Sequence, residues 1–284
     1  MGSSAARKRP ACLPAPLYSS SFQTAPKQKK PLPMRKLFVA LLIAATATVH
    51  AVAAAPCSQF LPNAQFPVLA NAKLASRTRL LCYSDFAVLH SGVTHGPLWP
   101  AEHLTRAHLD DAKNEVRTNK FFQDPSLPPG EGATLADYKR SGFDRGHMSP
   151  AGDRWNDEAM AQSFTLANVV PQDRNNNQHL WAHIESAVRK IAIRYGEAYV
   201  VTGPLFAGQS LRTIGANRVF VPTQLFKLVY VPAANEAFAV VVDNQATNRY
   251  DVKTVHELES ISGIRFTGIP EALKDQRIGG LKGV

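Results

Sequence analysis

The sequence predicts an α+β domain that combines a mixed, largely antiparallel sheet with flanking helices. Strand-like and helix-like segments occur in blocks rather than in strict alternation, which argues against a doubly wound parallel sheet. Two local signals support this prediction. Pro232–Glu236 separates two apolar strand patterns like the turn of a hairpin, and a long amphipathic helix is expected to begin near Asn177.

The expected strands follow the chain in order. Residues 80–91 show the alternation of a strand, whereas residues 126–142 are expected to form a long loop. Apolar and β-branched residues then predict three further strands, at residues 197–206, 218–232 and 236–244.

Two helices are expected in the second half of the chain. The first carries an apolar stripe at three- and four-residue spacing and ends at Gly196. Its stripe consists of Leu180, Ile184, Val188, Ile191 and Tyr195. The second is short, with a capping box made by Thr254 and Glu257 and a stop at Gly263. After Cys57 neither an internal repeat nor a long linker is evident, so residues 54–284 are predicted to form a single domain.

The net charge of +10 belongs mostly to the first 53 residues, which hold eight basic residues and no acid. The remainder has 24 basic and 22 acidic residues, a net charge of +2. Residues 34–53 have the layout of a secretory signal peptide, and the apolar run is short for a membrane span. Residues 1–33 are expected to be disordered or to precede a true start at Met34. A mitochondrial presequence is the alternative, although prolines oppose its amphipathic helix.

Removal of this leader would take Cys12 away and leave Cys57 and Cys82. Two cysteines in an exported chain predict one disulfide, and two free thiols in a reducing compartment are the alternative. The expected location is the periplasm or the extracellular space, with the mitochondrion as the alternative. Stable membrane insertion of the mature chain is not expected.

The stretch "SGFDRGHMSPAGD" at residues 141–153 is the most informative part of the sequence. It is too polar for a buried core strand and too rich in turn formers for a regular helix. It therefore predicts either a solvated loop or a functional site. Two further polar segments follow at a short distance, "ANVVPQ" at residues 167–172 and "NNNQHLWAHIE" at residues 175–185.

This ordered set resembles the DNA/RNA non-specific endonucleases, a ββα-metal (His-Me finger) family that includes endonuclease G and Serratia-type nucleases. The family shows Asp-Arg-Gly-His, then Asn-x-x-Pro-Gln, then Asn-Gln-x-x-Trp-x-x-x-Glu opening a helix. The similarity covers roughly residues 80–268. It implies a ββα-metal fold and hydrolysis of DNA and RNA with 5′-phosphate products.

The resemblance assigns His147 as the general base, and its residue type suits the task. An imidazole with a pKa near 6.5 can take a proton from water at neutral pH. Arg145 is expected to clamp a phosphate oxygen, with a salt bridge to Asp144 as the alternative. Asp144 is expected to position the loop, and Gly146 fits a place where the backbone passes close to another group.

The resemblance also implies a hydrated Mg²⁺ held by one amide oxygen, with Mn²⁺ as a substitute. The motif assigns this role to Asn177, although Asn175 and Asn176 leave the register open and one of the three can cap the helix. Glu185, eight residues later, can face the same side and is expected to support the water shell of the metal. Asn168 matches a family asparagine near the catalytic site.

Three other activities compete with this one. His179 and His183 stand four residues apart on a helix, but they lack the further ligands of a zinc hydrolase. An enzyme of the same fold that cleaves small nucleotides, and a module that binds nucleic acid without cleaving it, are the remaining alternatives. The expected partners are DNA and RNA, and a homodimer and an inhibitor protein are left open.

Overall fold

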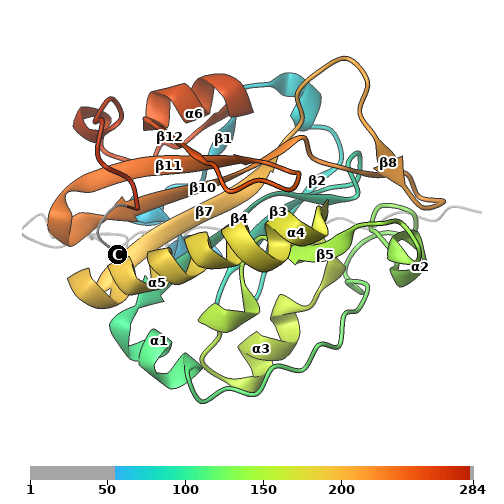
Figure 1. The fold of residues 1–284 in the computed structure, drawn as a ribbon, viewed down its shortest axis with the longest axis horizontal. Coiled ribbons are helices and arrows are strands. Elements are labelled where there is room, and N and C mark those ends of the chain that lie inside the picture. The colour runs from blue at the N-terminus through green and yellow to red at the C-terminus, as the bar shows by residue number, and fades with distance from the viewer. Residues whose placement is uncertain (1–54, 282–284) are drawn as a thin grey trace, which may run out of the picture. The chain divides into compact units, whose positions relative to one another are not determined.

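A seven-stranded sheet forms the centre of the structure, a computed structural model that describes residues 55–281 (Figure 1). Its spatial order is β12-β11-β10-β7-β4-β3-β2, and every neighbouring pair is antiparallel. The strands are β2 (Thr78–Cys82), β3 (Ala87–Ser91), β4 (Gly96–Thr105), β7 (Glu197–Leu205), β10 (Gln224–Val231), β11 (Glu236–Asp243) and β12 (Asp251–Lys253). The predicted α+β class with a largely antiparallel sheet is confirmed.

Helices and short β-ribbons surround this sheet. The helices are α1 (Arg106–Ala112), α2 (Leu135–Tyr138), α3 (Asp157–Ser163), α4 (Arg174–Asn176), α5 (Ala182–Tyr195) and α6 (Val255–Ser262). The ribbons are β1 (Val68–Leu69) with β13 (Ile264–Arg265), β5 (Asp144–His147) with β6 (Val169–Gln172), and β8 (Thr213–Ile214) with β9 (Val219–Phe220). Single 3₁₀ turns lie at Ser58–Phe60, Pro62–Ala64, Ala72–Leu74, Ala151–Asp153, Leu166–Asn168, Pro232–Ala234 and Glu271–Leu273.

The alternation of side chains along the central strands divides the core into two layers. Helix α5 covers one face, where Ile184 and Val188 pack with Val200 and Val240. Helix α6 covers the other face, where Leu258 packs in a cluster with neighbouring strand residues such as Val201. Figure 1 shows α5 and α6 on opposite sides of the sheet. The sheet is therefore buried on both faces, and the polar motifs must lie at its edges and ends.

Several local predictions agree with the structure. Strands β10 and β11 form the expected hairpin, in which Val231 pairs with Glu236 and Asn235 adopts a left-handed conformation. Helix α6 has the predicted capping box of Thr254 and Glu257 and ends at Gly263. The predicted leader, comprising residues 1–33 and the signal peptide at 34–53, lies outside the described residues. Within residues 55–281, no helix is both long and apolar enough to cross a membrane.

Other predictions were wrong in detail. Residues 218–232 do not form one strand, because Pro222 lacks an amide proton and separates β9 from β10. The expected loop at 126–142 contains α2, which a capping box of Thr134 and Asp137 stabilises. The stretch "DRGH" is a strand, β5, and its residues from Gly146 onward are buried.

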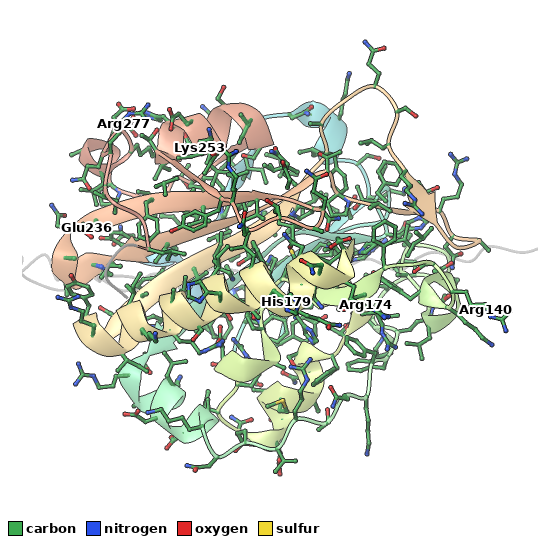
Figure 2. The ribbon with its side chains drawn as sticks, in the orientation of Figure 1. Arg140, Arg174, His179, Glu236, Lys253 and Arg277 are labelled. Carbon is green, nitrogen blue, oxygen red and sulfur yellow. A yellow bond between two sulfur atoms is a disulfide. The ribbon has the colours of Figure 1, made fainter. Side chains whose placement is uncertain are left out.

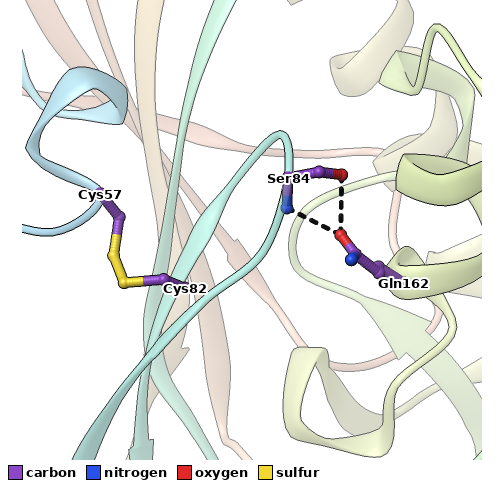
Figure 3. The surroundings of a disulfide bond; sticks show 4 residues. All are labelled: Cys57, Cys82, Ser84 and Gln162. Carbon is purple, nitrogen blue, oxygen red and sulfur yellow. Dashed lines mark hydrogen bonds between the residues drawn. A yellow bond between two sulfur atoms is a disulfide. The ribbon is translucent and has the colours of Figure 1, made fainter.

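A disulfide joins Cys57 to Cys82, with 5.7 Å between the Cα atoms, and this confirms the pairing expected from the cysteine count. The bond ties the N-terminal turns to β2 at the edge of the sheet (Figure 3). The turn after β2 is also fixed to α3, because Ser84 donates hydrogen bonds from its backbone amide and its hydroxyl to Gln162 Oε1. The Cys57–Cys82 bond joins residues separated by 25 positions in the sequence. On the chain-entropy model, a disulfide that closes a loop of this length stabilises the folded protein by roughly 3 kcal/mol.

Candidate active site

A cleft of about 700 Å³ opens beside the ribbon formed by β5 and β6. Charged and polar side chains dominate its wall, together with the aromatic rings of Phe121 and Phe143. The other lining residues are Arg117, Leu135, Tyr138, Lys139, Asp144, Arg145, Arg174, Asn177 and Gln178. Three of the residues singled out in the sequence, Asp144, Arg145 and Asn177, therefore meet at this cleft.

His147 lies at the end of β5, just behind the wall of the cleft. Its imidazole packs between Phe121, with 5.2 Å between ring centroids, and Phe164, at 4.9 Å. The side chain is almost fully buried, and its Nε2 atom has no hydrogen-bond partner within the described residues. A ring nitrogen without a partner in the protein can form a hydrogen bond with a substrate or a water molecule.

Burial, and after it the positive charges of Arg117, Arg154 and Arg145, lower the pKa of His147 to about 3. The imidazole is therefore neutral at physiological pH and can accept a proton, although burial makes it a weaker base than a free imidazole. In the unfolded chain its pKa returns to about 6.5, so between these two values the unfolded chain binds a proton that the folded protein does not. Stability must then fall as the pH drops below about 6.5.

We therefore expect the wild-type protein to lose more stability on acidification than a His147→Gln variant. At pH 5 the difference should be about 2 kcal/mol relative to pH 8, because one pKa unit corresponds to about 1.36 kcal/mol. Denaturant unfolding of both proteins at the two pH values measures this difference. Equal acid sensitivity would show that His147 is not held in its neutral form by the fold.

The three consecutive asparagines occupy different environments. Asn175 is exposed, whereas Asn176 is buried and donates a hydrogen bond of 3.1 Å to the carbonyl of Asp243. Asn177 lines the cleft. The residue that caps the N-terminus of the helix is Asp173, whose carboxylate accepts a hydrogen bond from the backbone amide of Asn176. None of the three asparagines therefore caps the helix. Among the three, only Asn177 offers its side chain to the cleft.

Asp144 fixes the orientation of the Asn177 amide. Its Oδ2 atom accepts hydrogen bonds from Asn177 Nδ2 at 3.1 Å and from Gln178 Nε2 at 2.8 Å, and its Oδ1 atom accepts from Arg174 Nε at 3.2 Å. An ionised carboxylate can only accept, so the NH₂ group of Asn177 must face Asp144. This leaves Asn177 Oδ1 as an available oxygen ligand. Asp144 also pairs with Arg174 rather than with Arg145, the partner considered from the sequence.

The backbone around Asn177 is unusual. Residues Asn177–Trp181 form a π-helical turn between α4 and α5, so the helix begins at Arg174 rather than near Asn177 as predicted. Such turns insert a residue into the helix and occur frequently at functional sites. The amphipathic stripe could not reveal this turn, because its first residue, Leu180, already lies within the turn and no stripe residue precedes it.

The donor set of the cleft fits a metal ion that is held mostly by water. Among residues 55–281, no group of three or more His, Cys, Asp or Glu side chains could form a protein cage for a metal. Asn177 Oδ1 is a hard oxygen ligand beside a cleft that is open to solvent. Mg²⁺ keeps several waters and accepts few protein ligands, so one amide oxygen is chemically sufficient for such an ion.

Glu185 lies on α5, is half-buried, and is not among the residues that line the cleft with Asn177. Burial, followed by the negative charges of Asp153 and Glu102, raises its pKa to about 7, against the opposing effect of Lys227 and Arg189. Its carboxylate can therefore change its protonation state near neutral pH. Within the described residues no hydrogen bond to this carboxylate is present, so it is available to a water molecule.

Two arginines that the sequence interpretation missed belong to this site. Arg117 lines the cleft 5.1 Å from the Phe164 ring centroid, and its charge acts on both His147 and Glu185. Arg189 Nη1 donates to Asp153 Oδ1 at 2.7 Å and faces Glu185 from the next turn of α5. The i,i+4 spacing of Glu185 and Arg189 was a readable signal. Arg117 stands in a segment without a pattern, so no local signal could identify it.

Asn168 is fully buried and does not reach the cleft. Its Oδ1 atom accepts from the Ser149 amide at 2.9 Å, and its Nδ2 atom donates to the carbonyls of Ser149 and Ser163. All of these contacts are internal, so the residue holds the segment after His147 in place. Its geometry is that of a positioning residue rather than of a catalytic one.

Gly146 is required by the close approach of its partner strand. A Cβ atom at this position would lie 2.6 Å from Gln172 Cβ and would overlap Gln172 Oε1. The Gln172 side chain therefore crosses directly over β5, and it donates to Asn176 Oδ1 at 2.8 Å. This contact couples the strand that ends in His147 to the helix that begins before Asn177.

A two-stranded ribbon that ends in a histidine, followed by a helix that presents an asparagine and a glutamate, is the ββα arrangement of the metal-dependent nucleases. Comparison with known proteins agrees with this class. Residues 67–270 match the model of the DNA/RNA non-specific endonuclease family. The chain belongs to this family, as its motifs predicted.

The relatives are themselves named as nucleases. Human mitochondrial nuclease EXOG is 34% identical over 213 residues, which cover 66% of this chain and 57% of the relative. Mitochondrial endonuclease G from Bos taurus is 34% identical over 264 residues, covering 86% and 84%. Nuclease C1 from Cunninghamella echinulata var. echinulata is 37% identical and covers 59% and 74%. The chain thus spans little more than half the length of EXOG but most of endonuclease G.

Similarity extends to a solved structure, that of EndoG in the EndoG/EndoGI complex, in which EndoG is inhibited. The two folds agree with a TM-score of 0.64 at 28% identity, over 69% of this chain and 88% of the other.

Proposed function

We propose that this protein is an Mg²⁺-dependent, sugar-non-specific endonuclease that hydrolyses phosphodiester bonds in DNA and RNA. One observation carries the proposal: a neutral, buried imidazole with an unpartnered nitrogen lies beside a cationic cleft that holds an available amide oxygen. Hydrolysis of a phosphodiester needs a base, stabilisation of negative charge and assistance to the leaving oxygen. His147, Arg145 with Arg117, and Asn177 supply groups suited to these three tasks.

The reaction begins when the unprotonated ring nitrogen of His147 takes a proton from a water molecule. The water oxygen then attacks phosphorus, and the bond between phosphorus and the 3′-oxygen breaks. The departing 3′-oxygen takes a proton from a second water molecule, so the products are a 5′-phosphate and a 3′-hydroxyl. Arg145 lies exposed on the wall of the cleft, where its guanidinium can bind a phosphate oxygen through charge-assisted hydrogen bonds.

Asn177 would hold the metal ion through Oδ1, and Glu185 would accept hydrogen bonds from the bound waters. When bound, such an ion neutralises charge on a phosphate oxygen and on the leaving 3′-oxygen. Asp144 keeps the Asn177 amide turned toward that position. Mn²⁺, which accepts the same oxygen ligands, is expected to substitute.

Indifference to the sugar follows from the chemistry of this wall. Its cations are suited to phosphate oxygens, which DNA and RNA share, and phosphate contacts carry no sequence information directly. Such binding should weaken steeply with salt. A homodimer and an inhibitor protein remain predictions.

The cellular location is a separate proposal. The Cys57–Cys82 bond supports a compartment in which disulfides persist, as expected for an exported protein in the periplasm or outside the cell. The relatives named as mitochondrial nucleases support the mitochondrion as the alternative. Fractionation of cells that express the full chain distinguishes the two.

Cleavage of supercoiled plasmid and of total RNA by the chain starting at Ala54 tests the proposed activity. We expect both substrates to be degraded with Mg²⁺ and to survive with EDTA, and we expect cleavage to return when Mg²⁺ is added in excess. Intact substrates in the presence of Mg²⁺ and folded protein would reject the proposal. Cleavage that EDTA does not affect would reject the metal requirement.

A further inference from the structure

The ribbon formed by β8 and β9 packs rigidly against α2 at one side of the cleft. Asp137 of α2 accepts hydrogen bonds from the backbone and side-chain amides of Asn217, at 3.0 and 2.8 Å. Gly215 approaches so closely, with a φ of +67°, that a Cβ atom at this position would overlap Asp137. Tyr138 and Lys139, the next residues after Asp137, line the cleft. The ribbon is therefore a fixed extension of the cleft wall.

Arg212, which precedes β8, is exposed and stacks on this wall. Its guanidinium carbon lies 4.7 Å from the ring centroid of Phe143, which lines the cleft. Arg145 makes the same kind of contact with Phe121, at 4.3 Å. Stacking on an aromatic ring holds a guanidinium in one plane and leaves its N–H donors free. Both arginines are thus pre-oriented for an anionic partner.

The charges around Arg212 are not neutralised by the protein. Within residues 55–281, none of five cations near this side of the cleft forms an ion pair with a carboxylate. These cations are Lys139, Arg140, Arg145, Arg212 and Arg218. Elsewhere many cations are paired, as Arg277 is with Glu257 and Lys274 with Glu259. Figure 2 shows Arg140 projecting into solvent beside α2, away from Arg277.

We propose that Arg212, held by Phe143 and by the β8–β9 ribbon, forms a phosphate-binding subsite for the part of a nucleic-acid strand that extends beyond the scissile bond. The inference rests on the proposed nuclease function and specifies its substrate class. The favoured substrate is a polynucleotide several residues long, because a dinucleotide that occupies the cleft beside His147 has no phosphate left to reach Arg212. Small nucleotide diesters are then poor substrates.

Kinetics on two substrates test this subsite. The probes are a 20-residue oligodeoxynucleotide and the dinucleotide thymidylyl-thymidine, each with Mg²⁺, and the variant is Arg212→Gln. We expect kcat/KM for the oligonucleotide to fall about tenfold, the size of one lost charge-assisted contact, with no change for the dinucleotide. The slope of the logarithm of the binding constant for the oligonucleotide against the logarithm of the salt concentration should also become shallower by about one unit.

Arg265→Gln is the matched control, because Arg265 is an exposed arginine on β13, outside the cleft. It should leave both substrates unaffected. An equal loss on both substrates, or equal kcat/KM for Arg212→Gln and Arg265→Gln on the oligonucleotide, would overturn the subsite while leaving the nuclease function intact. If the wild-type protein cleaved neither the oligonucleotide nor the dinucleotide, the proposed function itself would be overturned.

Discussion

Replacing His147 with alanine should lower kcat for plasmid cleavage by about 10³-fold, since general-base catalysis typically contributes a factor of 10² to 10⁴. Burial keeps the imidazole neutral, and its Nε2 atom has no hydrogen-bond partner within the described residues. The neighbouring cations of the cleft, Arg117 and Arg145, cannot accept a proton in its place. The loss should therefore appear in the chemical step.

Single-turnover nicking of supercoiled plasmid measures this step, and fluorescence anisotropy with a labelled oligonucleotide measures binding. Binding should stay within a few-fold of the wild-type value, because the cationic wall is unchanged. His147 also packs against Phe121 and Phe164, so His147→Gln serves as a second variant that preserves more of the volume. If either variant retained near-wild-type nicking while folded, the assignment of the base would be wrong.

The sequence was sufficient to predict the fold class, the family and the meeting of Asp144, Arg145 and Asn177 at one site. These residues belong to motifs whose order and spacing match those of the family, so the local sequence pattern was enough to identify them. The secondary structure of residues 144–147, which form β5, was harder to predict from the sequence. Its polar residues argued against a buried strand, but Asp144 is satisfied by Asn177 and Gln178 from a different element. Partners supplied by tertiary contact are invisible to a local pattern.

The same limit explains the roles that the sequence misjudged or missed. Asn168 belongs to a matching motif, but only the fold shows that its amide is fully used by Ser149 and Ser163. Beneath the site, the fully buried Arg154 pairs with Asp85 at 2.9 Å and with Glu102, residues far apart in the chain. Such a network becomes visible only when the strands are placed side by side. It fixes the segment after His147 because Glu102 also accepts from Ser149 Oγ at 2.6 Å.

Replacing Asn177 with alanine should lower kcat/KM by about 10²-fold and raise the Mg²⁺ concentration needed for half-maximal activity. Loss of the amide oxygen removes the one protein ligand that we assign to the ion, and metal-derived charge stabilisation is worth several kcal/mol in such reactions. Cleavage rates across a Mg²⁺ titration measure both effects. Thermal stability should change little, because Asn177 is partly exposed.

The neighbouring asparagines provide matched controls for this prediction. Asn175→Ala should leave activity, metal requirement and stability unchanged, because Asn175 is exposed and no hydrogen bond of its side chain is present among the described residues. Asn176→Ala should lower stability by about 1–3 kcal/mol, because it leaves Gln172 Nε2 without its partner and removes one of the hydrogen bonds that the Asp243 carbonyl accepts. A shifted Mg²⁺ requirement in Asn175→Ala, with an unshifted one in Asn177→Ala, would move the metal ligand to the other asparagine. The three variants together distinguish the proposed metal ligand Asn177 from the buried Asn176, which stabilises the fold, and from the exposed Asn175. The sequence alone cannot make this distinction, because the three residues are identical and adjacent.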